Sequence, residues 1–313
     1  MNDFASFLRG AGLIPGDILQ DGKWRRCATE DHPKKRNGSY KLAPDGLVGW
    51  CQDFATMSEP ITWRPDHNST PSPIDFAAIA RRRAEERRIE VRATQAASRY
   101  YLDCKPLIGG HPYLEQHGLK MDGCFGLKSD GGWLVIPVLK DRFLMSVQRI
   151  NQGGEKLFWP GAPVKAGSYT IDRRGAQVLV LCEGLATGLA IFAAVPTARV
   201  VVAFNSGNMA HVAIPRHGLV CVAADNDSAT EARIGRNPGL KAAQEAADAL
   251  GCGIAVPTGI QGSDWADYRN ERISAMLIDR LKMQESEIRR AIDGEISAAI
   301  MRNATFLRGM AAA

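Results

Sequence analysis

The chain has 313 residues, of which 45% are hydrophobic and 23% charged, with a formal net charge of +5. This composition is ordinary for a globular protein, and the length predicts more than one folding unit. No stretch approaches the roughly 18 uninterrupted apolar residues of a membrane span. The N-terminal MNDFASFLRG also lacks the basic start and long apolar run of a signal peptide, so we expect a cytoplasmic protein with no membrane partner.

The seven cysteines are scattered, and none forms a CxxC pair. This spacing argues against a zinc ribbon and against a disulfide framework. Near the start, only Cys27, His32 and Cys51 could bind zinc, whereas a structural zinc site needs four ligands. We therefore do not expect zinc.

Residues 1–66 combine short apolar pieces, turn residues and many basic side chains, which predicts a small basic and aromatic N-terminal module. Basic side chains can follow a phosphate backbone and aromatic rings can stack on unpaired bases, so this module is a candidate for binding a single-stranded template. The alternative is that its tryptophans form the core of a small domain. The candidate contacts are Trp24, Arg25, Arg26, Lys34, Lys35 and Arg36.

Residues 67–109 begin with the polar, proline-rich HNSTPSP, which is typical of a linker. The following DFAAIARRRAEERRIEVRATQAASRYYLDC has neither proline nor glycine and predicts a long helix. Its interleaved glutamates and arginines can pair at helical spacing, which favours a solvated face over a nucleic-acid contact. Residues 110–176 then become strand-like in WLVIPV and FLMSVQRI, and predict a basic α+β subdomain.

Residues 177–270 carry the most informative pattern. QVLVLCEG, RVVVAFN, GLVCVAAD and GIAVP are typical of buried strands, and LATGLAIFAAV and NPGLKAAQEAADALG are typical of helices. Short apolar strands that alternate with helices predict a Rossmann-like α/β domain with a mostly parallel sheet. Residues 271–313 are expected to be a helical C-terminal tail, with a weak break at Gly294. Its apolar face can pack on its own domain or dock a partner.

Acidic residues stand where the first and third of these strands end. Glu183 follows the first strand, and Asp225 and Asp227 follow the third. Ligand groups gather at the carboxyl ends of parallel strands, and hard cations prefer carboxylate oxygens. The two aspartates are two residues apart and point to the same side of an extended segment. The pattern predicts a site for Mg²⁺ or Mn²⁺, unless the aspartates only cap the next helix.

A further acidic pair, Asp264 and Asp267, follows the fourth strand. The pair could complete a second metal position, as in two-metal phosphoryl transfer, or could cap the helix that follows. Gly184, directly after Glu183, leaves room for substrate phosphates to approach the backbone.

The order of the EG, NSGN, DND and DWAD motifs on successive strands resembles the Toprim domain of bacterial-type primases, topoisomerases and some nucleases. The Toprim primases of plasmids and phages are the most similar. This likeness covers residues 180–270, and upstream HPYLEQHGL, GGWLVIPV, VQRI, EKLFWPG and VKAG resemble the basic half of the replicative primase core. The resemblance implies that Glu183, Asp225 and Asp227 are catalytic metal ligands, although Glu183 could instead be a general base.

The resemblance also implies a set of nucleotide- and template-binding positions. The basic members could hold phosphates as counter-charges: each taken alone is more often a solvated surface residue, but the ordered set favours this function. The set consists of Arg149, Lys156, Lys165, Gly184, Asn205, Gly207 and Asn208.

The function implied is that of a DNA primase, a nucleotidyltransferase that makes short primers on single-stranded DNA from nucleoside triphosphates for plasmid or phage replication. A separate replicative helicase could dock on the C-terminal helices. Two alternatives stay open: a metal-dependent Toprim nuclease, and a catalytically silent nucleic-acid-binding replication accessory protein, because fold alone does not determine function. A topoisomerase is disfavoured because no large domain accompanies the tyrosines.

Overall fold

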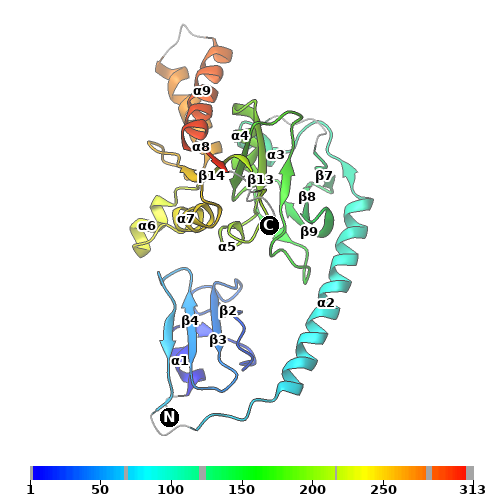
Figure 1. Cartoon of the computed structure of the whole chain (residues 1–313), viewed down its shortest axis with the longest axis vertical. Helices are drawn as coiled ribbons and strands as arrows, with labels where there is room; N and C mark the ends of the chain where they lie inside the picture. Colours follow the sequence, from blue (N-terminus) through cyan, green and yellow to red (C-terminus); the bar gives the residue numbers. More distant parts are fainter. Residues whose placement is uncertain (1–2, 67–69, 120–124, 216, 280–283, 308–313) are drawn as a thin grey trace. The chain divides into compact units, whose positions relative to one another are not determined.

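A computed structural model describes residues 3–66, 70–119, 125–215, 217–279 and 284–307 (Figure 1). The chain divides into two compact units, one formed by Met1–Arg87 with Thr230–Arg236 and the other by Arg88–Ala229 with Asn237–Ala313. The sequence predicts a finer division into five parts, and those boundaries stay predictions. In the described residues, no helix combines the length and apolar character needed to cross a membrane.

The N-terminal unit is an antiparallel sheet with one short helix, α1 (Phe4–Gly10), packed on it. The strands follow one another in sequence order: β1 (Leu13–Ile14), β2 (Arg25–Thr29), β3 (Gly38–Leu42), β4 (Gly49–Asp53) and β5 (Ile61–Trp63). Phe4 lies directly over Gly49, where an added Cβ would come within 2.3 Å of its ring. Trp63 is buried in this core, whereas Trp24 is 47% exposed. The expectation that tryptophans form the core therefore holds for Trp63 and not for Trp24.

The long charged segment forms α2 (Phe76–Asp103), as predicted. Ala97 is its one buried residue, so most of the helix is solvated. The absence of proline and glycine allows the uninterrupted helix, and the dense charges keep its surface in water.

The second unit begins with a five-stranded antiparallel sheet in the order β10-β9-β8-β7-β6. Its strands are β6 (Lys105–Pro106), β7 (Lys128–Asp130), β8 (Trp133–Lys140), β9 (Phe143–Ile150) and β10 (Lys156–Phe158), with the short helix α3 (Pro112–Gln116) between β6 and β7. β8 and β9 alternate between two faces. Ile136 and Ile150 join the large core, whereas Val135 and Val147 form a separate cluster with Tyr100 and Trp159.

The other sheet of this unit has the order β11-β13-β12-β14-β15, and β16 (Thr305–Leu307) also pairs with β14. Its remaining strands are β11 (Tyr169–Ile171), β12 (Val178–Cys182), β13 (Ala198–Val202), β14 (Gly218–Ala223) and β15 (Gly253–Ala255). The four strands predicted between 177 and 270 pair in parallel, while β11 and β16 are antiparallel edges. The predicted Rossmann-like, mostly parallel sheet is therefore confirmed.

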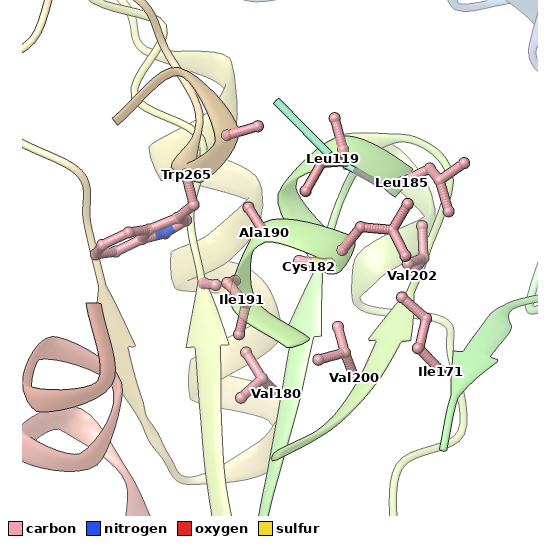
Figure 2. Close-up of a cluster of buried hydrophobic side chains, with 14 of the residues drawn as sticks. Leu119, Ile171, Val180, Cys182, Leu185, Ala190, Ile191, Val200, Val202 and Trp265 are labelled. Atoms are coloured by element: carbon pink, nitrogen blue, oxygen red, sulfur yellow. The ribbon is translucent and has the colours of Figure 1, made fainter. Parts of the chain in front are cut away.

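Helices cover both faces of this sheet (Figure 1). α4 (Leu185–Ala194), α8 (Trp265–Asp279) and α9 (Glu285–Asn303) pack together on one face, and α5 (Ser206–Met209) and α7 (Pro238–Leu250) cover the other. α6 (Ser228–Ile234) lies between β14 and α7 in the chain. Figure 2 shows Val180, Cys182 and Val200 of the sheet packed against Leu185 and Ile191 of α4. Two covered faces explain why these strands are continuous apolar runs rather than alternating ones.

The C-terminal region is part of this unit. α8 runs through residue 270, and α9 buries an isoleucine on nearly every turn: Ile288, Ile292, Ile296 and Ile300. The predicted break at Gly294 is wrong, because α9 continues through that residue. Packing of the isoleucine stripe offsets the cost of about 1 kcal/mol that glycine brings to a helix interior. The strand β16 was not predicted, since three residues carry no periodic signal.

Candidate active site

Two neighbouring parallel strands position the acidic residues. From β12 the chain continues to β13 on one side and later to β14 on the other, so strand order reverses between β12 and β14. The register pairs Cys182 with Ala223, which brings Glu183 and Asp225 to the same edge of the sheet just beyond these residues. Ligands of open α/β sheets bind at this kind of crevice. The positions predicted from the strand ends are thus adjacent in the fold.

The carboxyl groups of this edge interact electrostatically. Burial raises the pKa of Asp225 well above its ordinary value, and the charges of Glu183, Asp264 and Asp227 raise it further. Burial and the charge of Asp227 likewise raise the pKa of Glu183, while a backbone N–H of Ser206 and the charge of Lys156 act in the opposite direction. Burial and the charge of Asp267 raise the pKa of Asp264, against hydrogen bonds from two backbone N–H groups. Half-buried carboxylates that repel one another favour a bound cation.

The described side chains do not form a closed metal-binding shell. Among them, no group of three histidine, cysteine, aspartate or glutamate residues is close enough together to hold a metal ion. The chemistry of the donors, oxygen carboxylates in mutual repulsion, fits Mg²⁺ or Mn²⁺. The assignment of Glu183, Asp225 and Asp227 as metal ligands therefore stays a prediction, and it requires their side chains to close around the ion.

Thr187 donates a hydrogen bond to one of these carboxylates, and this residue was not predicted from the sequence. Its hydroxyl, on the first turn of α4, donates to Oδ1 of Asp225 at 3.3 Å, and its side chain is fully buried. The signal was present in CEGLATG, because a threonine four residues after Glu183 lies at the start of a helix that begins at the same edge.

Asp227 contacts the start of a helix, which is one of the two roles that the sequence left open, and its role as a metal ligand stays a prediction. Its Oδ2 accepts the backbone N–H of Gly239 at 2.9 Å, at the first turn of α7. Asn237, the N-cap of α7, accepts the N–H of Asp227 at 3.1 Å and donates to Asn226 at 2.9 Å. Gly239 is required here, because a Cβ would lie 2.3 Å from the carbonyl oxygen of Asp225. Asp227 thus contacts a helix start while remaining in electrostatic range of Glu183.

Asp264 and Asp267 cap the start of α8. Oδ1 of Asp264 accepts the N–H groups of Ala266 and Asp267 at 2.7 and 2.9 Å. In return, Oδ2 of Asp267 accepts the N–H groups of Ser263 and Asp264 at 2.9 and 3.3 Å. The structure therefore shows the helix capping that the sequence offered as one of two interpretations. A second metal position at this pair stays a prediction, and Asp264 is the member that adds charge at Asp225.

The two basic residues of the β9–β10 pair lie on opposite faces of their sheet. Lys156 pairs with Ile150, and Leu157 pairs with Arg149. Because side chains alternate along a strand, Lys156 shares the face of the buried Ile150, and its charge acts on Glu183. The guanidinium of Arg149 instead lies 5.3 to 5.8 Å from the ring centres of three aromatic residues, namely Tyr100, Trp133 and Trp159. The structure brings Lys156, but not Arg149, to the acidic edge.

The side-chain amide of Asn208 hydrogen-bonds to three backbone groups. It is buried, its Oδ1 accepts the N–H of Ala166 at 2.7 Å, and its Nδ2 donates to the carbonyls of Gly167 and Ala203, both at 2.8 Å. It therefore holds the segment after the exposed Lys165 to the end of β13. Asn205 is the N-cap of α5, and its side chain makes no capping hydrogen bond. A nucleotide-binding role for Lys165, Asn205 and Gly207 stays a prediction.

Gly184 begins α4. The atom nearest to a Cβ built there is Oγ1 of Thr187, at 3.9 Å, so the backbone is open on that side. This openness agrees with the expected approach of phosphates, which also stays a prediction.

The candidate single-strand contacts of the N-terminal unit gather around one pocket of about 640 Å³. All six predicted residues line it: Trp24, Arg25, Arg26, Lys34, Lys35 and Arg36. Arg25 forms ion pairs with Asp21 and Glu86, and Arg26 lies 4.4 Å over the ring of Phe54. Lys34, Lys35 and Arg36 are exposed, so the pocket keeps a basic rim.

Comparison with known proteins agrees with this geometry. Residues 178–275, from β12 into α8, match the family described as the Toprim domain, so this part of the chain is a Toprim domain. Two Escherichia coli proteins named DNA primase TraC are each 28% identical to the chain, over 273 and 274 residues. Both alignments include 80% of this chain but only 26% and 19% of the relatives, so the chain spans about a quarter and about a fifth of their length. The resemblance to plasmid-type Toprim primases is confirmed at this level.

A solved structure, the primase fragment of the bacteriophage T7 primase-helicase protein, is also similar, with 12% identity and a TM-score of 0.34. The similarity covers 54% of this chain and 68% of that one.

Proposed function

We propose that the chain is a DNA primase that synthesises short primers on single-stranded DNA by metal-dependent nucleotidyl transfer. The observation that carries this proposal is a set of carboxylates with a lysine beside them. Glu183, Asp225 and Asp227 stand at the switch point of a Toprim sheet, and Lys156 faces them from the adjacent sheet. The similarity to proteins named DNA primase supports the same function.

In the proposed reaction, a primer 3′ hydroxyl attacks the α-phosphate of a nucleoside triphosphate, a new P–O bond forms, and pyrophosphate leaves. A Mg²⁺ or Mn²⁺ ion held by Glu183, Asp225 and Asp227 would supply charge stabilisation at the attacking and leaving oxygens. Thr187 orients Asp225, and Lys156 offers a counter-charge to the triphosphate. Glu183 is either a ligand or the base that accepts the hydroxyl proton.

The N-terminal unit would bind the template. Exposed basic side chains at the rim of its pocket can follow phosphates, while the exposed ring of Trp24 offers a stacking face for a base. This part of the proposal is separate from the chemistry, because it rests on a different unit.

A helicase partner stays a prediction. The apolar stripe of α9 is fully buried in its own domain, so a partner would have to use other surfaces of the C-terminal helices.

The test is primer synthesis on single-stranded DNA with labelled ribonucleotides and Mg²⁺ or Mn²⁺. The wild type is expected to make short oligomers, and Asp225→Asn to make none while still binding DNA. Asp248→Asn is the matched control, because Asp248 is exposed on α7 and undergoes the same chemical change. Metal-dependent nicking without nucleotides would instead establish a nuclease, and DNA binding with neither activity would indicate an accessory protein.

A further inference from the structure

A tyrosine outside the predicted site faces the acidic edge. Tyr113 belongs to α3, the short helix within HPYLEQHGL, and is 3% exposed. The charges of Asp264, Asp225 and Asp267 all act on its hydroxyl, so the hydroxyl lies within electrostatic range of these carboxylates. α3 and the Toprim helices share one hydrophobic core.

The hydroxyl of Tyr113 is buried and has no hydrogen-bond partner among the described residues. Buried hydroxyls in native proteins are nearly always paired, so an unpaired one beside a functional cluster calls for a ligand. Burial, followed by the neighbouring carboxylates, raises the pKa of Tyr113, which keeps the phenol protonated at neutral pH. The group is therefore a neutral O–H donor without an acceptor.

Two histidines of the same segment contact Tyr113. The side chain of His111 caps α3 by accepting the N–H of Tyr113 at 3.2 Å, and its other ring nitrogen lies 3.0 Å from the carbonyl oxygen of Gly132. The ring of His117 packs edge-on against Tyr113 with centroids 4.7 Å apart. His111 thus fixes the backbone of Tyr113 and His117 contacts its ring, so the hydroxyl is held in place before any ligand binds.

A cation lies on the same ring. Nζ of Lys156 is 5.8 Å from the ring centre of Tyr113, and its charge also acts on Glu183. An acceptor reaching the tyrosine hydroxyl thus meets a positive charge on one side and carboxylates on the other. A free anion would be repelled by the carboxylates, but a phosphate that brings a divalent cation satisfies both sides.

We propose that the Tyr113 hydroxyl donates a hydrogen bond to a phosphate oxygen of the metal-bound nucleoside triphosphate, next to Lys156. This inference rests on the proposed function, since it names a contact of the same site. Tyr113 is then a substrate-contacting residue that the acidic motifs do not reveal.

The test compares Tyr113→Phe with Tyr100→Phe. Tyr100 also has a buried hydroxyl, but it interacts with the side chains of Asp130 and Cys104 and belongs to the aromatic cluster around Arg149 on the other face of the sheet. Affinity for a non-hydrolysable nucleoside triphosphate is measured with saturating Mn²⁺, and Mn²⁺ affinity alone is measured by the signal of the free ion in electron paramagnetic resonance.

Tyr113→Phe is expected to weaken nucleotide binding roughly tenfold, the effect of losing one hydrogen bond to a charged acceptor. It should leave Mn²⁺ affinity and thermal unfolding unchanged, and Tyr100→Phe should bind nucleotide as the wild type does. Wild-type nucleotide affinity in Tyr113→Phe, or an equal loss of Mn²⁺ affinity without nucleotide, would overturn the inference. A wild-type protein that binds no nucleotide would instead refute the proposed function.

Discussion

Replacing Asn208 with alanine would separate a structural role for this residue from a nucleotide-binding one. The substitution removes three hydrogen bonds of 2.7 to 2.8 Å, which join Ala166, Gly167 and Ala203 through one buried side chain. Each such bond contributes about 1 kcal/mol net, and a buried backbone group left without a partner costs more. We therefore expect the free energy of unfolding to fall by about 3 kcal/mol.

The loss is measured by thermal unfolding followed by circular dichroism, without nucleotide. For a domain of this size about 3 kcal/mol corresponds to a fall in Tm of roughly 6–12 °C. Asn208→Asp should be as damaging, because a carboxylate keeps the acceptor for Ala166 but faces two carbonyl oxygens. Asn205→Ala is the control and should change stability by less than about 0.5 kcal/mol. Wild-type stability in Asn208→Ala, together with weaker nucleotide binding, would refute the structural role.

Three further predictions follow from the same contacts. Without metal, Asp225→Asn should become more stable relative to the wild type as pH rises from about 4 to 7. The pKa of Asp225 is raised in the folded protein, so the stability that its protonated form contributes is present below the unfolded pKa of 3.8 and is lost as pH rises. Urea midpoints measure the difference, and a constant difference across the pH range would contradict the prediction. Ile292→Ala should cost roughly 2–5 kcal/mol of unfolding free energy, whereas Ile278→Ala, at a side chain 75% exposed, should cost little in the same urea titration. Lys156→Met should weaken Mn²⁺-dependent nucleotide binding in equilibrium dialysis and Arg149→Met should not; equal losses would show that the two faces of the sheet do not separate these residues.

Much of the Toprim domain could be predicted because its signals are local. Each parallel strand is a short apolar run covered on both faces, and each helix between strands has its own periodicity and start signal, as in Asn237 before Pro238. Glu183 and Asp225 could be assigned to one edge, since parallel strands end on the same side. The capping role of Asp264 and Asp267 was also open to sequence reasoning as one of two interpretations.

Only the tertiary structure decided the environments of several side chains, because these depend on pairing between distant segments. The register of β9 against β10 places Lys156 and Arg149 on opposite faces, and no spacing within either strand reveals that register. The role of Asn208 depends on backbone groups of Ala166 and Gly167, some forty residues away. Tyr113 reaches the acidic edge because α3 packs in the same core as α8. Local sequence determines which elements form, but the environment of a side chain is set by non-local packing, and that packing distinguishes a ligand-binding group from a structural one.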